Sequence, residues 1–87
     1  MSTTSEPRPI TRRIGAGEID LEYGSASFFL HFTLRRRQRQ WWVLGHRNSR
    51  IGERFEDGPF ATRALATSYA AAIFERELVL HRAARDR

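Results

Sequence analysis

The densest group of chemically active side chains lies in the middle of the 87-residue chain, where the run from Arg35 to Gln40 reads Arg-Arg-Arg-Gln-Arg-Gln. Guanidinium groups bind phosphates and carboxylates in a fork geometry and stack on rings, which ammonium groups do not do. A run of charge is usually a solvated surface, but four arginines in six positions exceed what solubility requires. The run therefore predicts contact with phosphates or with an acidic protein.

Aromatic side chains flank this run on both sides. On an open β-sheet, rings stack on nucleic-acid bases while arginines neutralise phosphates, and a sheet can also enter the major groove of DNA. We therefore predict a non-catalytic nucleic-acid-binding protein with DNA as its partner. The predicted contact residues are Arg35, Arg36, Arg37, Arg39, Phe29, His31, Trp41, Arg47 and Arg50. Exposed rings also mark protein interfaces, so the alternative is docking on an acidic protein, or a homodimer through the sheet or the helix edge.

The charge of the whole chain agrees with either partner. The net charge is +5, and all fifteen basic residues are arginine. A basic balance favours an acidic partner, which is nucleic acid, an anionic membrane surface or an acidic protein. No apolar run approaches the ~20 residues that span a bilayer, and the N-terminus lacks the apolar segment of a secretory signal. We expect a soluble cytoplasmic protein without a membrane partner.

Groups suited to catalysis are sparse. The chain has no cysteine, and its three histidines are far apart in sequence. Glu18, Asp20 and Glu22 alternate along one segment, where paired carboxylates could do acid–base work. We interpret them instead as the solvated face of an edge strand or as partners of arginines on neighbouring strands. Without a nucleophile and base pair, a glycine-rich phosphate loop or a ligand cluster, we expect no enzyme activity, no cofactor and no metal site.

Hydrophobic alternation predicts the strands that must position these groups. The predicted strands are Glu18–Tyr23, Phe28–Leu34, about Arg39–His46 and a short fourth strand at Ile51–Glu56. A period of two places Ile19, Leu21 and Tyr23 on a core face, and likewise Phe28, Leu30, Phe32 and Leu34. Because neighbours in a strand alternate, one tryptophan must point inward. We favour Trp42 and Leu44 in the core, which puts Trp41 outside; the alternative is Trp41 and Val43 in the core.

The last element is an alanine-rich helix. Thr62 is the predicted N-cap, and the segment from Arg63 to Leu78 has no glycine or proline. The predicted buried stripe comprises Thr67, Ala70, Ala71, Phe74 and Leu78, flanked by Ala66 and Ile73. Leu65, Tyr69, Val79 and Leu80 lie off this stripe and predict a second, partly exposed apolar edge.

These elements predict an α+β fold. We expect an antiparallel meander of three or four strands, packed on one face by a single C-terminal helix and open on the other. Residues 1–13 are polar, contain Pro7 and Pro9 and predict a disordered basic arm, while residues 14–87 form one domain. Asp57-Gly58-Pro59 and Arg47-Asn48-Ser49-Arg50 are predicted turns.

The order of the elements resembles that of a known family. Trp41–Leu44, then Phe60–Arg63, then the helical Ala64–Ala72 are similar to the arm-site DNA-binding domains of tyrosine recombinases, also called AP2-like integrase domains. The resemblance implies strands in the major groove, a supporting helix behind them, and DNA contacts by the open face and the hairpin arginines. In its size and arginine content the chain also resembles small phage- or plasmid-type proteins, which implies docking on a host protein as the alternative.

Overall fold

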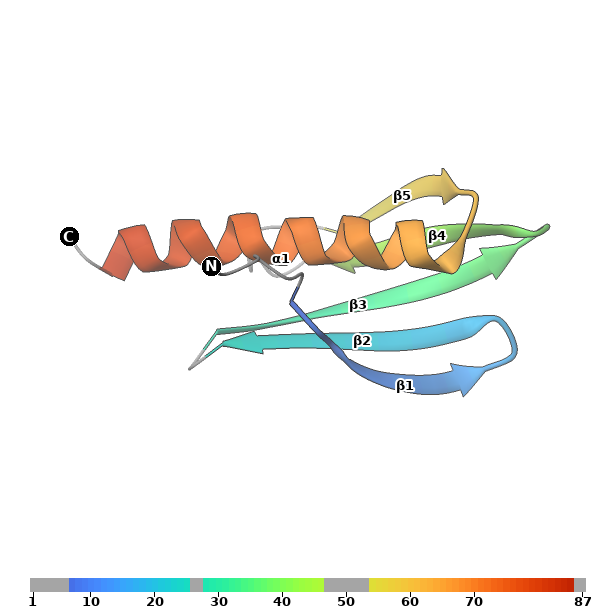
Figure 1. Cartoon of the computed structure of the whole chain (residues 1–87), viewed down its shortest axis with the longest axis horizontal. Helices are drawn as coiled ribbons and strands as arrows, with labels where there is room; N and C mark the ends of the chain where they lie inside the picture. The colour runs from blue at the N-terminus through green and yellow to red at the C-terminus, as the bar shows by residue number, and fades with distance from the viewer. Residues whose placement is uncertain (1–6, 26–27, 47–53, 86–87) are drawn as a thin grey trace, which may run out of the picture.

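A computed structural model describes residues 7–25, 28–46 and 54–85. They form five antiparallel strands and one long helix (Figure 1). The elements are β1 (Ile10–Gly15), β2 (Glu18–Ser25), β3 (Phe28–Arg37), β4 (Gln40–His46), β5 (Arg54–Phe60) and α1 (Arg63–Arg85). The strands follow one another in the sheet in sequence order, so the predicted meander is confirmed. The expected three or four strands are corrected to five in the described part of the chain.

The helix covers one face of the sheet, as predicted. It contacts β2, β3, β4 and β5 but not β1. The core between the two layers is built around Tyr23, Phe28 and Phe74. The Phe74 ring stacks on both others, with ring centroids 5.4 Å from Tyr23 and 5.9 Å from Phe28. The opposite face, which we call the open face, carries no helix from the described part of the chain (Figure 1).

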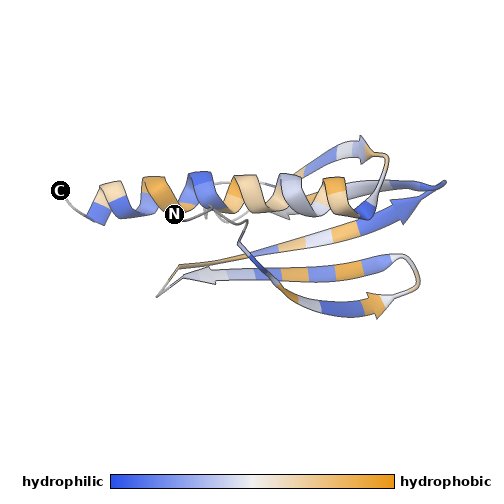
Figure 2. Cartoon of the chain, in the orientation of Figure 1, coloured by the Kyte–Doolittle hydropathy of each residue, from blue (hydrophilic) through white to orange (hydrophobic). Residues whose placement is uncertain are grey.

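Alternation predicted the inward residues of β2 and β3 correctly. Ile19 pairs with Leu34, and Leu21 pairs with Phe32; all four are buried. Opposite residues in an antiparallel pair point to the same face, so these pairs fix the core side of both strands. Figure 2 shows the resulting alternation of hydrophobic and hydrophilic residues along β2 and β3.

The first strand, β1, corrects the prediction of a disordered N-terminal arm. Residues Ile10 to Arg13, expected in a disordered arm, belong to β1 and pair with β2. The segment lacks a period of two because both of its faces are exposed, so it gave no strand signal. Ala16 and Gly17 make the turn into β2, and Gly17 has a φ of 72°, which glycine adopts without steric cost.

The turn between β3 and β4 corrects the position of Trp41. The turn holds only Gln38 and Arg39, whose φ angles of 51° and 68° are typical of a type I′ hairpin. Arg37 therefore pairs with Gln40, and the register carries on to pair Leu34 with Val43. Val43 is fully buried, so the favoured assignment was wrong and the alternative, Trp41 and Val43 inward, is correct.

The fifth strand differs from its prediction in its bounds. Phe55 is buried and anchors β5, as expected. The strand continues to Phe60 through Asp57, Gly58 and Pro59, which were predicted to form a turn. The pairing of β4 with β5 shifts register between Trp41 and Val43, and this irregularity accommodates a segment with a poor intrinsic preference for strands.

The helix agrees closely with its pattern. The Thr62 hydroxyl accepts a hydrogen bond from the Leu65 amide at 3.1 Å, which confirms the N-cap. From the predicted stripe and its flanks, Ala66, Ala70, Ala71 and Phe74 are buried, and Leu78 and Ile73 pack on the core edge. Leu65, Val79 and Leu80 are exposed, as expected for the second apolar edge.

The two-residue turn leads to a stability prediction. Type I′ turns favour Asn-Gly, because a left-handed backbone costs residues with a Cβ about 1–2 kcal/mol each. Replacing Gln38→Asn and Arg39→Gly together should raise the free energy of unfolding by about 1–2 kcal/mol, measured by urea denaturation. Arg39→Ala alone, which keeps a Cβ at the strained position, is the control and should give little or no stabilisation.

Candidate nucleic-acid interface

The hairpin between β3 and β4 reaches beyond the strands on either side of it. The last β3 residue paired with β2 is Arg35, and the first β4 residue paired with β5 is Trp41. Residues 36–40, which we call the hairpin overhang, therefore form a two-stranded ribbon. Within the described residues, its only further backbone hydrogen bond joins the Arg36 amide to the Gly17 carbonyl oxygen at 2.8 Å. The β3–β4 turn projects past the neighbouring turns at that end of the sheet (Figure 1).

The overhang consists entirely of long polar side chains. It holds three arginines and two glutamines and no acidic residue. Arg37 pairs with Gln40 and Arg36 with Trp41, so successive side chains point to opposite sides of the ribbon. All five side chains of the overhang are exposed. The ribbon thus presents hydrogen-bond donors on both of its faces and at its tip.

The structure separates the predicted arginine cluster into two groups. The Arg35 Nε lies 2.7 Å from Glu18 Oε2, and the Arg37 Nη1 lies 2.9 Å from Glu56 Oε2. Arg36 and Arg39 make no ion pair with any residue that the structure describes. Arg35 and Arg37 lie on the open face, where carboxylates of β2 and β5 reach them. Arg36 points to the opposite face because neighbours in a strand alternate, and Arg39 lies in the turn.

The open face is a ladder of cross-strand polar pairs. Besides the pair of Arg35 and Glu18, the Thr33 hydroxyl donates to Asp20 Oδ1 at 3.3 Å, and His31 Nε2 lies 3.8 Å from Glu22 Oε1. The interpretation of the acidic residues as partners of a neighbouring strand is confirmed for Glu18. Their position on an edge strand is wrong, because β1 lies outside β2.

Two of the three rings predicted for the open face lie there, and the third, Trp41, does not. Phe29 is on this face and 57% exposed, and His31 is exposed on the same side. The tryptophan of this face is Trp42, half-buried, whereas Trp41 packs against the core. Register places Trp42 on β4 where the ion pair between Arg37 of β3 and Glu56 of β5 crosses over.

Two predicted contact residues, Arg47 and Arg50, lie outside the described residues. Two arginines that were not predicted do lie on the open face: Arg12, opposite Asp20, and Arg54, two positions before Glu56 on β5. A two-residue turn, if assumed for this hairpin, would have predicted Trp42 on the open face, because the number of turn residues sets the face of every residue in β4.

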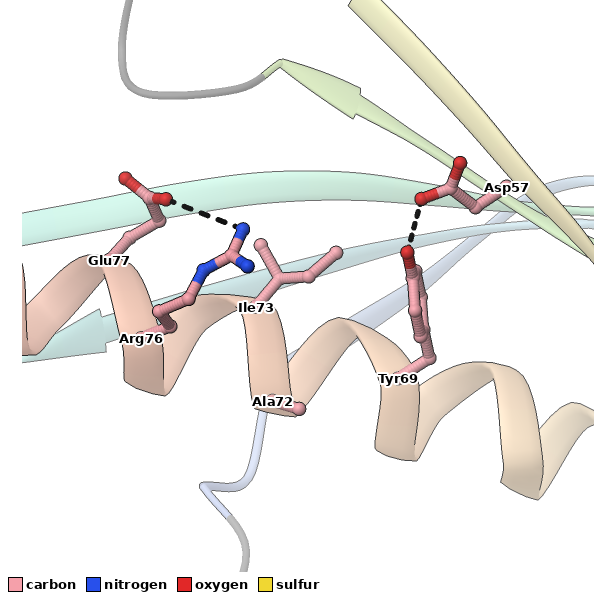
Figure 3. Close-up of a pocket in the computed structure, with 6 residues that line it drawn as sticks. All are labelled: Asp57, Tyr69, Ala72, Ile73, Arg76 and Glu77. Atoms are coloured by element: carbon pink, nitrogen blue, oxygen red, sulfur yellow. Dashed lines mark hydrogen bonds and ion pairs between the residues drawn. The ribbon is translucent and has the colours of Figure 1, made fainter.

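A pocket between β5 and α1 is the place where catalytic groups would be sought (Figure 3). Its polar groups interact with one another: the Tyr69 hydroxyl donates to Asp57 across the pocket, and Arg76 Nη2 lies 3.8 Å from Glu77 Oε2. The bond from Tyr69 to Asp57 joins the helix to the sheet edge. These contacts give the pocket a role in docking the helix.

The described residues contain no group of three or more His, Asp or Glu side chains placed to hold a metal ion. Within the same residues, α1 is too polar to cross a bilayer. No protein-family model, no curated protein and no solved structure matches the chain. Function is therefore inferred from the side chains and their geometry.

Proposed function

We propose that the chain binds duplex DNA without catalysis and inserts the hairpin overhang into the major groove. The observation that carries this proposal is a protruding two-stranded ribbon made only of arginine and glutamine. The open face, which the sequence predicted to share the contact with the hairpin arginines, has a secondary role because Arg35 is occupied there by Glu18. Arg36 and Arg39 are the principal contacts.

The shape and chemistry of the ribbon favour DNA over RNA. The major groove of B-form DNA admits a two-stranded β-ribbon, whereas the deep, narrow groove of A-form RNA does not. Arginine forms a bidentate pair with guanine and glutamine with adenine, so both residue types of the overhang match base edges. Arginines on opposite sides of the ribbon would also reach the phosphates of both groove walls.

The strain of the turn supports the same proposal. Gln38 and Arg39 both occupy the left-handed region, where residues with a Cβ are disfavoured. Strained positions cluster at functional sites, where the side chain compensates for the cost in stability. The likeness to arm-site domains also predicts DNA contact at this end of the sheet, and it stays a prediction.

The proposal is tested by fluorescence anisotropy with a labelled DNA duplex at two salt concentrations. Each neutralised phosphate adds about 0.9 to the slope of log affinity against log salt, so the two principal contacts predict a loss of roughly 12-fold between about 50 and 200 mM. Duplex RNA of the same sequence is the control and should bind more weakly. Absence of binding at low salt, or equal affinity for both duplexes, would contradict the proposal.

A further inference from the structure

The outer edge of β1 is a surface that the proposed DNA contact does not use. β1 pairs with β2 on one side, and no described strand pairs with its other side. Backbone N–H and C=O groups along a free edge are a template for a further strand. Ile10 is 71% exposed and Ile14 is 50% exposed, which is unusual for branched apolar residues in a strand.

A hollow of about 290 Å³ opens on the open face beside the start of β1. The Phe29 ring lies over Gly24 on its floor, where even a Cβ on Gly24 would come within 2.5 Å of the ring. Ile10 and Arg8 lie at its rim. Glu22 and Ser25 also line it, so the hollow combines polar and apolar groups, and its Ile10 side can contact one large side chain from a strand placed beside β1.

Next to the hollow, β1 carries positive charges that have no ion-pair partner among the described residues. Arg12 lies on the open face opposite Asp20, and Arg13 lies on the other face opposite Ile19. Neither arginine, nor Arg8, makes an ion pair with any residue in the described ranges. Along this edge, the position of Ile10 suits an apolar side chain, and the positions of Arg12 and Arg13 are cationic.

We infer that β1 accepts an acidic extended peptide as a sixth strand. Main-chain hydrogen bonds to β1 give the affinity, and the alternate side chains give the specificity. Antiparallel pairing places one large apolar side chain of the peptide opposite Ile10, at the edge of the hollow. Acidic side chains then lie opposite Arg12 and Arg13. Glu22, the β2 partner of Ile10, disfavours a carboxylate at the apolar position.

A second copy of the chain fits this edge less well than an acidic peptide. The antiparallel register that pairs two β1 strands over the whole of Ile10–Ile14 places Arg12 directly opposite its own copy. Like charges at opposite positions destabilise a strand pair. Charge complementarity therefore selects the acidic peptide. This inference does not depend on DNA binding, because it uses none of the overhang residues.

The test is a titration of the isotope-labelled protein with the acetylated, amidated peptide Ser-Glu-Glu-Val-Leu-Thr-Ser, followed by NMR. Backbone amide shifts should be confined to β1 and to the floor of the hollow, at Gly24 and Phe29. A matched peptide with lysine in place of both glutamates should not bind. Arg12→Glu should weaken binding roughly tenfold and restore binding of the lysine peptide, whereas Arg85→Glu, the matched charge change on the helix, should do neither.

Three outcomes would overturn the inference. No shifts at up to about 1 mM peptide would mean that the edge takes no such strand. Shifts confined to the hairpin overhang would mean that the peptide only neutralises the arginines proposed to contact DNA. Concentration-dependent β1 shifts without any peptide would mean that a second copy occupies the edge.

Discussion

The double substitution Arg36→Gln and Arg39→Gln is expected to weaken binding to duplex DNA by roughly 100-fold. An arginine that contacts guanine or phosphate contributes about 1–3 kcal/mol, and about 1.4 kcal/mol corresponds to a tenfold change. Both residues are exposed on the overhang, free of carboxylate partners among the described residues. Fluorescence anisotropy at constant salt measures the loss, and circular dichroism verifies the fold.

A control with the same charge change separates a local contact from overall charge. Arg82→Gln with Arg85→Gln removes two positive charges near the C-terminal end of α1, at the far end of the molecule from the overhang (Figure 1). This control should change the affinity by less than about threefold, since the two sites are separated by more than a Debye length of about 10 Å. Equal losses in the two double variants would assign binding to the net charge and reject the overhang as the contact.

The second large effect is on stability. Phe74→Ala should lower the free energy of unfolding by about 3–5 kcal/mol, as truncation of a buried phenylalanine usually does. Phe74 is 3% exposed and stacks on Tyr23 and Phe28, with ring centroids 5.4 and 5.9 Å away. Its loss would leave a cavity where the helix meets β2 and β3. Urea denaturation followed by circular dichroism measures the change.

The matched control truncates the same residue type on the other side of the sheet. Phe29→Ala removes a ring that is more than half exposed, and should cost less than about 1 kcal/mol. Phe74→Leu, which fills most of the volume, should lose less than about 1.5 kcal/mol and keeps the comparison measurable if the alanine variant does not fold. Similar losses for Phe74→Ala and Phe29→Ala would mean that the open face is covered, and would remove it as a contact surface.

Local sequence was sufficient for elements whose side chains alternate between two different environments. The strands β2 and β3 and the helix have one apolar and one polar side, so a period of two or of about 3.6 identified them. The strand β1 has two exposed sides, and β5 contains glycine and proline. Backbone hydrogen bonds to a neighbouring strand hold β1 and β5 in the sheet, and such pairing produces little hydrophobic pattern in the sequence of the strand itself.

The candidate site was predicted in part. The run from Arg35 to Arg39 was recognised as the basic tip of a hairpin, and the structure places it there. Pairing of arginines with the carboxylates of β2 was predicted, and Glu18 confirms it. Which arginines are paired was not predictable, because Glu18 and Glu56 reach Arg35 and Arg37 from strands 17 and 19 residues away in sequence. Exposure of Phe29 and His31 was predicted correctly, while Trp41 and Trp42 exchange places.

By itself, the sequence determined an alanine-rich helix backing a meander, a core face on β2 and β3, and an arginine-rich hairpin. Only the tertiary structure decided which arginines have carboxylate partners among the described residues, which tryptophan faces outward, and that β1 forms one edge of the sheet with a hollow beside it. The physical reason is register. Side-chain alternation is a local property of each strand, but the residue that lies opposite is set by turn length and by backbone hydrogen bonds between strands.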